Sequence, residues 1–285
     1  MPSSEPVTGP VAVHAEGPVW SPRWGLRYVD MLAGDVLQLQ PDGSVRRRHV
    51  DAVAAVVRPR TRGGWVVVGE RRLHTCDADD LDGPLAPGPV VFSDSEIRLN
   101  EGGCDPSGDL YAGSMGYEAE PGRGTFYRID TGGRWHVVLP QVTISNGFEF
   151  SPDGTRAYYV DTPTGGVDVF DWLPGTGLTN RRRLVDVDPH DGGPDGLTVD
   201  SEGHLWVALF GGSAVHRYTP EGALADVLTV PVRQVTAVTF GGADLDEVFI
   251  TTSSDGLGDD AEPLAGAVFH ASVGVRGLPV REYAG

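Results

Sequence analysis

Hydrophobic residues along this chain occur in short blocks that are separated by turns rich in glycine, proline and aspartate. Six blocks look alike and each follows a turn: residues 26–30 (LRYVD), 65–69 (WVVVG), 110–114 (LYAGS), 157–161 (AYYVD), 205–209 (LWVAL) and 248–252 (VFITT). Their first residues lie 39 to 48 positions apart. Short blocks rich in β-branched and aromatic residues between turn signals predict β-strands. The chain therefore repeats a strand-forming unit six times.

Each repeat contains further strands. A second β-prone stretch follows each block, beginning at Val36, Arg72, Thr125, Gly166, Ala214 and Ala267, and another precedes it. Repeats of roughly 40–50 residues with several strands each are typical of propeller blades. Because helical periodicity is scarce, we predict an all-β protein, a six-bladed β-propeller that forms a single domain over residues 1–285, with 1–10 flexible. The missing outer strand of the ring could come from residues 8–14 (TGPVAVH) or 278–285 (LPVREYAG).

The same register places polar residues around the propeller axis. Counting six residues back from the turn in each repeat gives Glu16, Ala55, Asn100, Asn146, Asp195 and Thr236. The innermost strands run along the central channel, so equivalent positions form a ring. Burying carboxylates there costs free energy unless a partner compensates them, and a hard divalent cation would do so. Asn-Gly and Asp-Gly pairs also form ordinary turns, but their recurrence in one register favours a metal site.

Composition excludes several classes of function. The chain has 40 acidic residues against 22 basic ones, a net charge of −18. Such a surface repels phosphates and anionic lipids, so we expect no nucleic-acid or membrane partner. Every basic residue is arginine, which excludes Schiff-base and P-loop chemistry. The polar opening lacks a secretory signal, and two cysteines are too few for a disulfide scaffold. We therefore expect a cytoplasmic protein, and a monomer.

Five segments carry motifs that can be compared with known families. They are residues 14–20 (HAEGPVW), 98–115, 144–162, 192–212 and 240–269. In this order they resemble the family of SMP-30 (regucalcin), gluconolactonases and related sugar lactone hydrolases, and they cover nearly the whole chain. The resemblance implies a six-bladed propeller with one divalent metal ion. Carried over by motif, the metal ligands would be Glu16, Asn146 and Asp195.

The resemblance also implies a substrate shell and a reaction. Arg98, Asn100 and Glu118 would bind the substrate, and Asp195 would also be the catalytic general base. Family members hydrolyse cyclic esters of sugar acids, so the expected function is metal-dependent hydrolysis of a small-molecule sugar lactone to the aldonic acid. One departure is visible, because this chain reads Asn-Glu-Gly at 100–102 where the family usually has Asn-Asp-Gly. The preference for gluconolactone is therefore not carried over.

Alternatives remain for both the metal and the function. All-oxygen ligands suit Ca²⁺, Mg²⁺ and Mn²⁺, and Zn²⁺ or Fe²⁺ would also be accepted. The same metal site would serve a non-catalytic Ca²⁺-binding regulatory propeller, and a lactonase or arylesterase-like hydrolase of another ester is a neighbouring alternative. A WD40-type interaction propeller is disfavoured, because it needs no axial carboxylates and no WD or GH signature recurs. Arg98 with Asn100 favours the enzyme, because a regulator needs no substrate shell.

Overall fold

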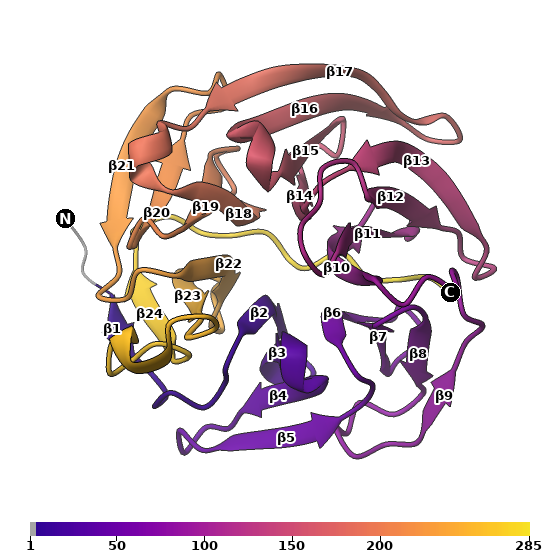
Figure 1. The fold of residues 1–285 in the computed structure, drawn as a ribbon, viewed down its shortest axis with the longest axis horizontal. Helices are drawn as coiled ribbons and strands as arrows, with labels where there is room; N and C mark the ends of the chain where they lie inside the picture. The colour runs from indigo at the N-terminus through magenta and orange to yellow at the C-terminus, as the bar shows by residue number, and fades with distance from the viewer. Residues whose placement is uncertain (1–3) are drawn as a thin grey trace.

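The computed structural model describes residues 4–285, which form six four-stranded antiparallel sheets around a central axis (Figure 1). The predicted all-β, six-bladed propeller is therefore confirmed. Within these residues the helices are four 3-10 turns: η1 (Met31–Ala33), η2 (Thr162–Thr164), η3 (Pro189–Asp191) and η4 (Gly258–Asp260). In the described part of the chain, no helix has the length and apolar character needed to cross a membrane.

In each blade the strands follow one another outward from the axis (Figure 1). The first two blades contain β2 (Ala15–Ser21), β3 (Gly25–Asp30), β4 (Asp35–Leu39) and β5 (Val45–His49), then β6 (Ala54–Pro59), β7 (Trp65–Gly69), β8 (Leu73–Cys76) and β9 (Leu85–Pro87). The third and fourth contain β10 (Ile97–Cys104), β11 (Leu110–Gly116), β12 (Gly124–Ile129) and β13 (Trp135–Val142), then β14 (Ser145–Phe150), β15 (Arg156–Asp161), β16 (Gly166–Leu173) and β17 (Gly177–Asp186). The fifth and sixth contain β18 (Gly193–Val199), β19 (Leu205–Phe210), β20 (Ala214–Tyr218) and β21 (Leu224–Thr229), then β22 (Val235–Gly241), β23 (Glu247–Thr252), β24 (Val268–Ser272) and β1 (Glu5–Pro6). The six similar blocks of the sequence are the second strands of their blades.

The ring is closed by the N-terminal strand. β1 pairs antiparallel with β24, with Glu5 opposite His270 and Pro6 opposite Phe269. This outer strand lies just before residues 8–14, so neither of the two segments considered from the sequence forms it. Within the segment 1–10, which was expected to be flexible, the backbone of Glu5 and Pro6 is paired with the open edge of β24. Residues 1–3 lie outside the described residues.

The C-terminal segment 276–285, here called the strap, crosses the ring at the end where the inner strands finish (Figure 1). It contacts one turn or loop from each of the six blades, through Arg23, Pro59, Gly108, Ser151, Ser201 and Leu245. Four of these contacts are backbone hydrogen bonds of 2.7–2.9 Å. A cavity of about 510 Å³ lies between the strap and the inner strands, lined in part by Arg58, Glu149 and Arg281. The strap therefore ties the blades together beneath the channel.

Hydrophobic and aromatic side chains fill the wedges between neighbouring blades. All five residues of β7 are buried. Between the third and fourth blades, the rings of Phe126 and Tyr159 lie 4.7 Å apart, centroid to centroid. Arg27 is fully buried between the first and second blades, where its guanidinium lies 4.2 Å from the ring of Trp24 and 5.4 Å from that of Trp65. This dense packing holds the inner strands at fixed positions around the channel.

Candidate metal centre

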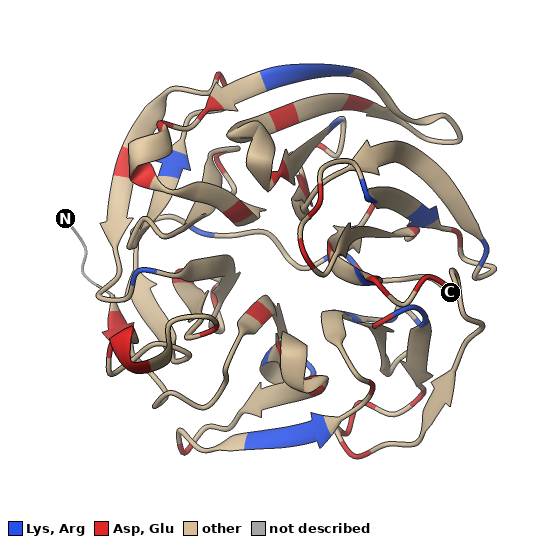
Figure 2. Ribbon diagram, in the orientation of Figure 1, with Lys and Arg blue, Asp and Glu red and all other residues tan. Residues whose placement is uncertain are grey.

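Every inner strand carries a β-bulge at one level of the channel. The strand pairing shifts next to Glu16, Ala55, Asn100, Asn146, Asp195 and Thr236. These are the six positions that the sequence register places in a ring. A bulge interrupts the alternation of side chains along a strand and redirects one of them. The ring is therefore a repeated feature of the blades, and Figure 2 marks acidic positions on β2 and β18, two of the innermost strands.

Two ring residues present buried oxygen atoms that lack a hydrogen-bond partner. The side chains of Asn146 and Asp195 are each 5% exposed, and Oδ1 of both residues is unpaired in the described part of the chain. Glu16 is 2% exposed, and its Oε2 accepts a 2.8 Å hydrogen bond from the Gly17 amide. Buried acceptors without a partner carry a large desolvation cost. A divalent cation among these three oxygen-bearing side chains would offset that cost, so the residues fit the predicted ion.

A hydroxyl group at the start of η2 sets the orientation of Asn146. The Asn146 amide nitrogen donates to Oγ1 of Thr162 at 3.0 Å, and that hydroxyl donates to the Pro194 carbonyl at 2.9 Å. Because the amide nitrogen is used in this way, the carbonyl oxygen is the atom left free. The structure thus makes Asn146 an acceptor, as a metal ligand must be.

Burial and mutual repulsion both disfavour ionised carboxylates at the axis. Burial, followed by the charges of Asp195 and Glu101, raises the pKa of Glu16 well above its usual value. Burial, followed by the charge of Glu101, does the same to the pKa of Asp195. A nearby cation reverses this balance, because it favours the charged form of each carboxylate. The electrostatics are those of a site suited to positive charge.

The other three ring positions offer no free side-chain oxygen. Ala55 has none, and Oγ1 of Thr236 donates to the Ala15 carbonyl at 2.6 Å. Oδ1 of Asn100 accepts from Nη1 of Arg98 at 2.6 Å, and the Asn100 amide nitrogen donates to a backbone carbonyl on β14. The ligand set within the ring is thereby limited to the three residues expected from the family motif. Their binding of a metal stays a prediction.

The predicted substrate-binding residues lie in the third blade. Arg98 is buried beside Asn100 on β10, and its Nε has no hydrogen-bond partner among the described residues. Its guanidinium lies 5.9 Å from the ring of Tyr117, in the turn after β11. Glu118 follows in that turn with an exposed side chain. The structure thus brings Arg98 and Asn100 into contact, while Glu118 lies at the same end of the blade without a hydrogen bond to either.

Glu101 is a buried carboxylate that the sequence marks only as a departure from the family's usual Asn-Asp-Gly. It is 5% exposed, and its Oε2 has no partner among the described residues. Burial raises the pKa of its carboxyl group. The available signal was the register, because the equivalent positions after Glu16, Asn146 and Asp195 are all glycine.

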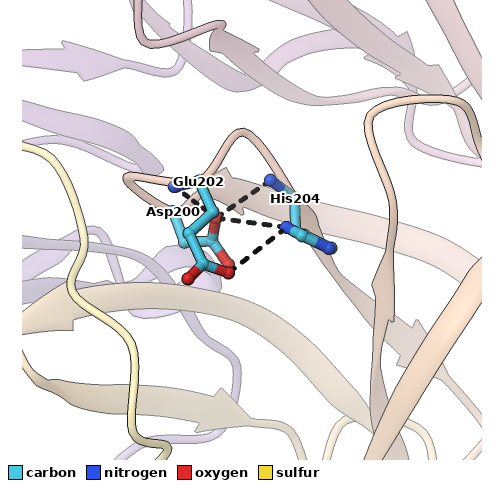
Figure 3. Close-up of side chains that lie close together, drawn as sticks. All are labelled: Asp200, Glu202 and His204. Atoms are coloured by element: carbon cyan, nitrogen blue, oxygen red, sulfur yellow. Dashed lines mark hydrogen bonds and ion pairs between the residues drawn. The ribbon is translucent and has the colours of Figure 1, made fainter.

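A second acidic cluster lies at the opposite end of β18 (Figure 3). Ligand atoms of Asp200, Glu202 and His204 all lie within 4.8 Å of one another, and such groups are consistent with a divalent metal. The carboxylate of Asp200 already accepts bonds from the backbone amides of Glu202 and His204, from Trp206 and from Arg217. Because these donors saturate its oxygens and Arg217 neutralises its charge, we interpret the cluster as a structural turn.

Metal binding and pH are expected to act together on stability. With chelator present, stability should fall as pH rises above 3.8 and 4.5, the ordinary pKa values of Asp195 and Glu16. Because the pKa values of both carboxyl groups are higher in the folded protein, the folded protein keeps protons that the unfolded chain has already lost. The stabilisation that these protons give is complete below the unfolded-state pKa values, and it disappears as pH rises through the folded-state pKa values. Excess Ca²⁺ or Mn²⁺ should therefore raise Tm more at higher pH.

Thermal unfolding at several pH values, with chelator and with each metal, measures this dependence. Asp195→Asn is the matched variant, and we expect it to lose most of the metal-dependent rise in Tm. An increase in Tm that is the same at every pH, or that survives unchanged in Asp195→Asn, would contradict the prediction.

Comparison with known proteins identifies a family and several relatives that are similar to this chain. A family model described as the SMP-30/gluconolactonase/LRE-like region matches residues 14–254. Regucalcin of Oryctolagus cuniculus is 33% identical over 95% of this chain and 94% of its own length. A 6-deoxy-6-sulfogluconolactonase of Pseudomonas putida is 35% identical over 96% of each. Two solved structures are similar to the whole fold. The structure of a luciferin-regenerating enzyme matches with a TM-score of 0.91 and 28% identity, and covers all of both chains. The structure of a calcium-binding protein, regucalcin, from Agrobacterium tumefaciens matches with a TM-score of 0.90 and 28% identity, and covers 97% of this chain and 95% of its own.

Proposed function

The chain belongs to the SMP-30/gluconolactonase/LRE-like family, and on this premise we propose that it hydrolyses a sugar lactone to the aldonic acid with one divalent metal ion. The observation that supports the proposal is the set of buried oxygens of Glu16, Asn146 and Asp195, two of which lack a partner among the described residues. A buried arginine with an unpaired Nε, Arg98, lies in the same site. The lactonase of Pseudomonas putida, by its name, supports the class of substrate.

Asp195 has the position and chemistry of a general base. A divalent ion held by Glu16, Asn146 and Asp195 would polarise the ester carbonyl and lower the pKa of a bound water. The Asp195 carboxylate takes a proton from the attacking water and returns it to the ring oxygen of the ester as the acyl C–O bond breaks, so that this oxygen leaves as a hydroxyl group. Water is thereby added across the ester bond, and no covalent enzyme intermediate is required.

Arg98 and Asn100 would fix the lactone beside that carboxylate. The hydrogen bond between Arg98 and the Asn100 carbonyl oxygen holds the guanidinium in place and leaves its Nε as a donor. Donation from Arg98 to the substrate's ring oxygen or hydroxyl groups orients the ester for attack. Glu118, on the turn above, would accept hydrogen bonds from hydroxyl groups at the far end of the sugar.

Glu118→Gln is expected to raise KM for the lactone by about tenfold, because a hydrogen bond to a charged acceptor is weakened. The value of kcat and the affinity for metal should stay within about twofold, since Glu118 is exposed in the turn after β11 and is not among the proposed metal ligands. Steady-state kinetics with metal in excess measures the effect. Glu120→Gln, in the same turn, is the control and should leave KM unchanged. A wild-type KM in Glu118→Gln would remove Glu118 from the substrate shell.

A non-catalytic Ca²⁺-binding propeller is the second candidate function. It is favoured by the Agrobacterium tumefaciens structure, which is described as a calcium-binding protein, and by the several regucalcins among the relatives. Such a protein would need the carboxylates of the axis but not the paired Arg98 and Asn100. The presence of that pair is the reason to prefer the enzyme.

Proton release over a panel of five- and six-membered aldonolactones tests the two functions. The panel should include a 6-sulfonated gluconolactone, and each assay is run with chelator and after adding back single metals. We expect chelator-sensitive turnover of one or two lactones. Tight metal binding with no turnover above spontaneous hydrolysis would favour the binding protein.

A further inference from the structure

Glu101 places a carboxylate where the three ligand-bearing blades have glycine. The residues that follow Glu16, Asn146 and Asp195 are Gly17, Gly147 and Gly196. At two of these positions no side chain would fit, because a Cβ at Gly147 would lie 2.6 Å from the Asp195 carbonyl oxygen and one at Gly196 would lie 2.4 Å from the Cβ of Ala237. In β10 the equivalent bulge residue carries a long acidic side chain. The third blade therefore adds a group that the other blades exclude.

The contacts of Glu101 leave much of its charge uncompensated. Oε1 accepts from the Gly102 amide at 3.1 Å and lies 3.8 Å from Nη2 of Arg58. That Arg58 nitrogen is closer to a different acceptor, the Gly102 carbonyl, at 2.6 Å. Oε2 has no partner among the described residues, and the residue is 5% exposed. An ionised carboxylate in this position needs positive charge from another source.

The Glu101 carboxyl group faces the same space as the proposed metal ligands. Glu101 belongs to the same level of bulges as Glu16 and Asp195, and its charge acts on both. In the described residues, the three carboxylates do not form a group whose ligand atoms all lie within 4.8 Å. Glu101 therefore acts through its charge at short range, directly or across a bound water, and is not required as an inner ligand.

We propose that Glu101 is a third carboxylate of the axial cation site and that its charge raises the affinity of this chain for a divalent cation. The inference rests on the proposed metal centre. With Glu101, three negative charges face a cation of charge two, and part of the excess is offset by Arg58, 3.8 Å from Glu101, and by the buried Arg98. More carboxylates around an oxygen-lined site raise its affinity for a hard cation such as Ca²⁺.

A purely positional role is the competing explanation. In that case Glu101 would donate a hydrogen bond to Glu16 and hold it in place without contributing charge. Glutamine has nearly the same size and can make the same donation, so Glu101→Gln preserves the positional role and removes only the charge. Glu101→Gly reproduces the residue found at the equivalent positions of the ligand-bearing blades. It removes both the charge and the hydrogen bond to Glu16.

Titration calorimetry with Ca²⁺ at neutral pH provides the test, with the chelator-treated full-length protein as the starting material. We expect Glu101→Gln and Glu101→Gly to raise the Kd for Ca²⁺ by about tenfold or more, and Glu101→Asp to stay within about threefold of wild type. Glu149→Gln is the matched control, because Glu149 is another partly enclosed carboxylate of the channel, three residues beyond Asn146. Its Kd should be unchanged. Thermal unfolding of each variant checks that it is folded.

Each outcome decides the proposal. A wild-type Kd in Glu101→Gln would overturn it and leave the positional role, and an equal loss in Glu149→Gln would show a general charge effect of the channel. If Glu101→Gln does not fold, a wild-type Kd in Glu101→Gly overturns the proposal, and a raised Kd in Glu101→Gly together with a near-wild-type Kd in the charge-keeping Glu101→Asp supports it. A wild-type protein that binds none of Ca²⁺, Mn²⁺ and Zn²⁺ would reject the metal centre itself and this inference with it. Normal wild-type binding with unchanged variants rejects Glu101 alone.

Discussion

Asp195→Asn is expected to lower kcat/KM for the lactone by about 10³-fold or more, since general-base catalysis alone contributes about 10²–10⁴-fold. Asparagine keeps the size and shape of the side chain but removes its charge and its ability to take up a proton. Asp195 is 5% exposed and its Oδ1 has no partner in the described residues, so its carboxylate is free to act on a water in the site. The variant should also bind the metal more weakly, because a ligand charge is lost.

The two losses can be separated by measuring kcat/KM as a function of metal concentration. If weak metal binding were the whole effect, activity would return at high metal, whereas loss of the base leaves a deficit at saturation. Glu149→Gln is the control, because it removes a carboxylate from the same channel but outside the ligand ring, and it should keep wild-type activity. Substantial activity of Asp195→Asn at low metal concentration would contradict the assignment of Asp195 to either role.

The propeller could be predicted from the sequence because its defining pattern is local. Residues 65–69 were expected to form a strand from their composition, and β7 spans the same residues. The spacing between such blocks reflects the size of one blade, so six blocks at this spacing predict six blades. The ring of axial residues could be predicted from the same regularity. The bulges next to Asn146 and Asp195 each lie the same number of residues before the turn that follows. Regular repetition is what makes a position in the sequence correspond to a position around the axis.

The closure of the ring could not be predicted in this way. It depends on Glu5 pairing with His270, two residues at opposite ends of the chain, and a strand of two residues has no hydrophobic period of its own. The position of Glu101 was hidden for a related reason. A bulge redirects side chains, so strict alternation along β10 does not tell which of Asn100 and Glu101 faces the channel. Only the three-dimensional arrangement shows that both are buried there.

Removing the strap residues 277–285 is expected to lower Tm by about 10 °C or more. Tyr283 is 2% exposed, and its deletion resembles the truncation of a buried aromatic residue, which costs about 3–5 kcal/mol. The backbone hydrogen bonds from the strap to Pro59, Gly108 and Leu245 each contribute about 1 kcal/mol. In a protein of this size each kcal/mol shifts Tm by about 2–4 °C. The loss should be large because the strap contacts every blade.

Thermal unfolding by circular dichroism compares the truncated chain with two point variants. Tyr283→Ala should account for a large part of the loss, because it removes the buried ring and the hydrogen bond from its hydroxyl to the Asp130 carbonyl. Glu282→Gln should change stability by less than about 1 kcal/mol, since its ion pair with Arg23 is partly exposed to solvent. A truncated protein with wild-type Tm would mean that packing between the blades and the pairing of β1 with β24 hold the ring without the strap. The expected result would instead show that six similar blades depend on one dissimilar segment for their cohesion.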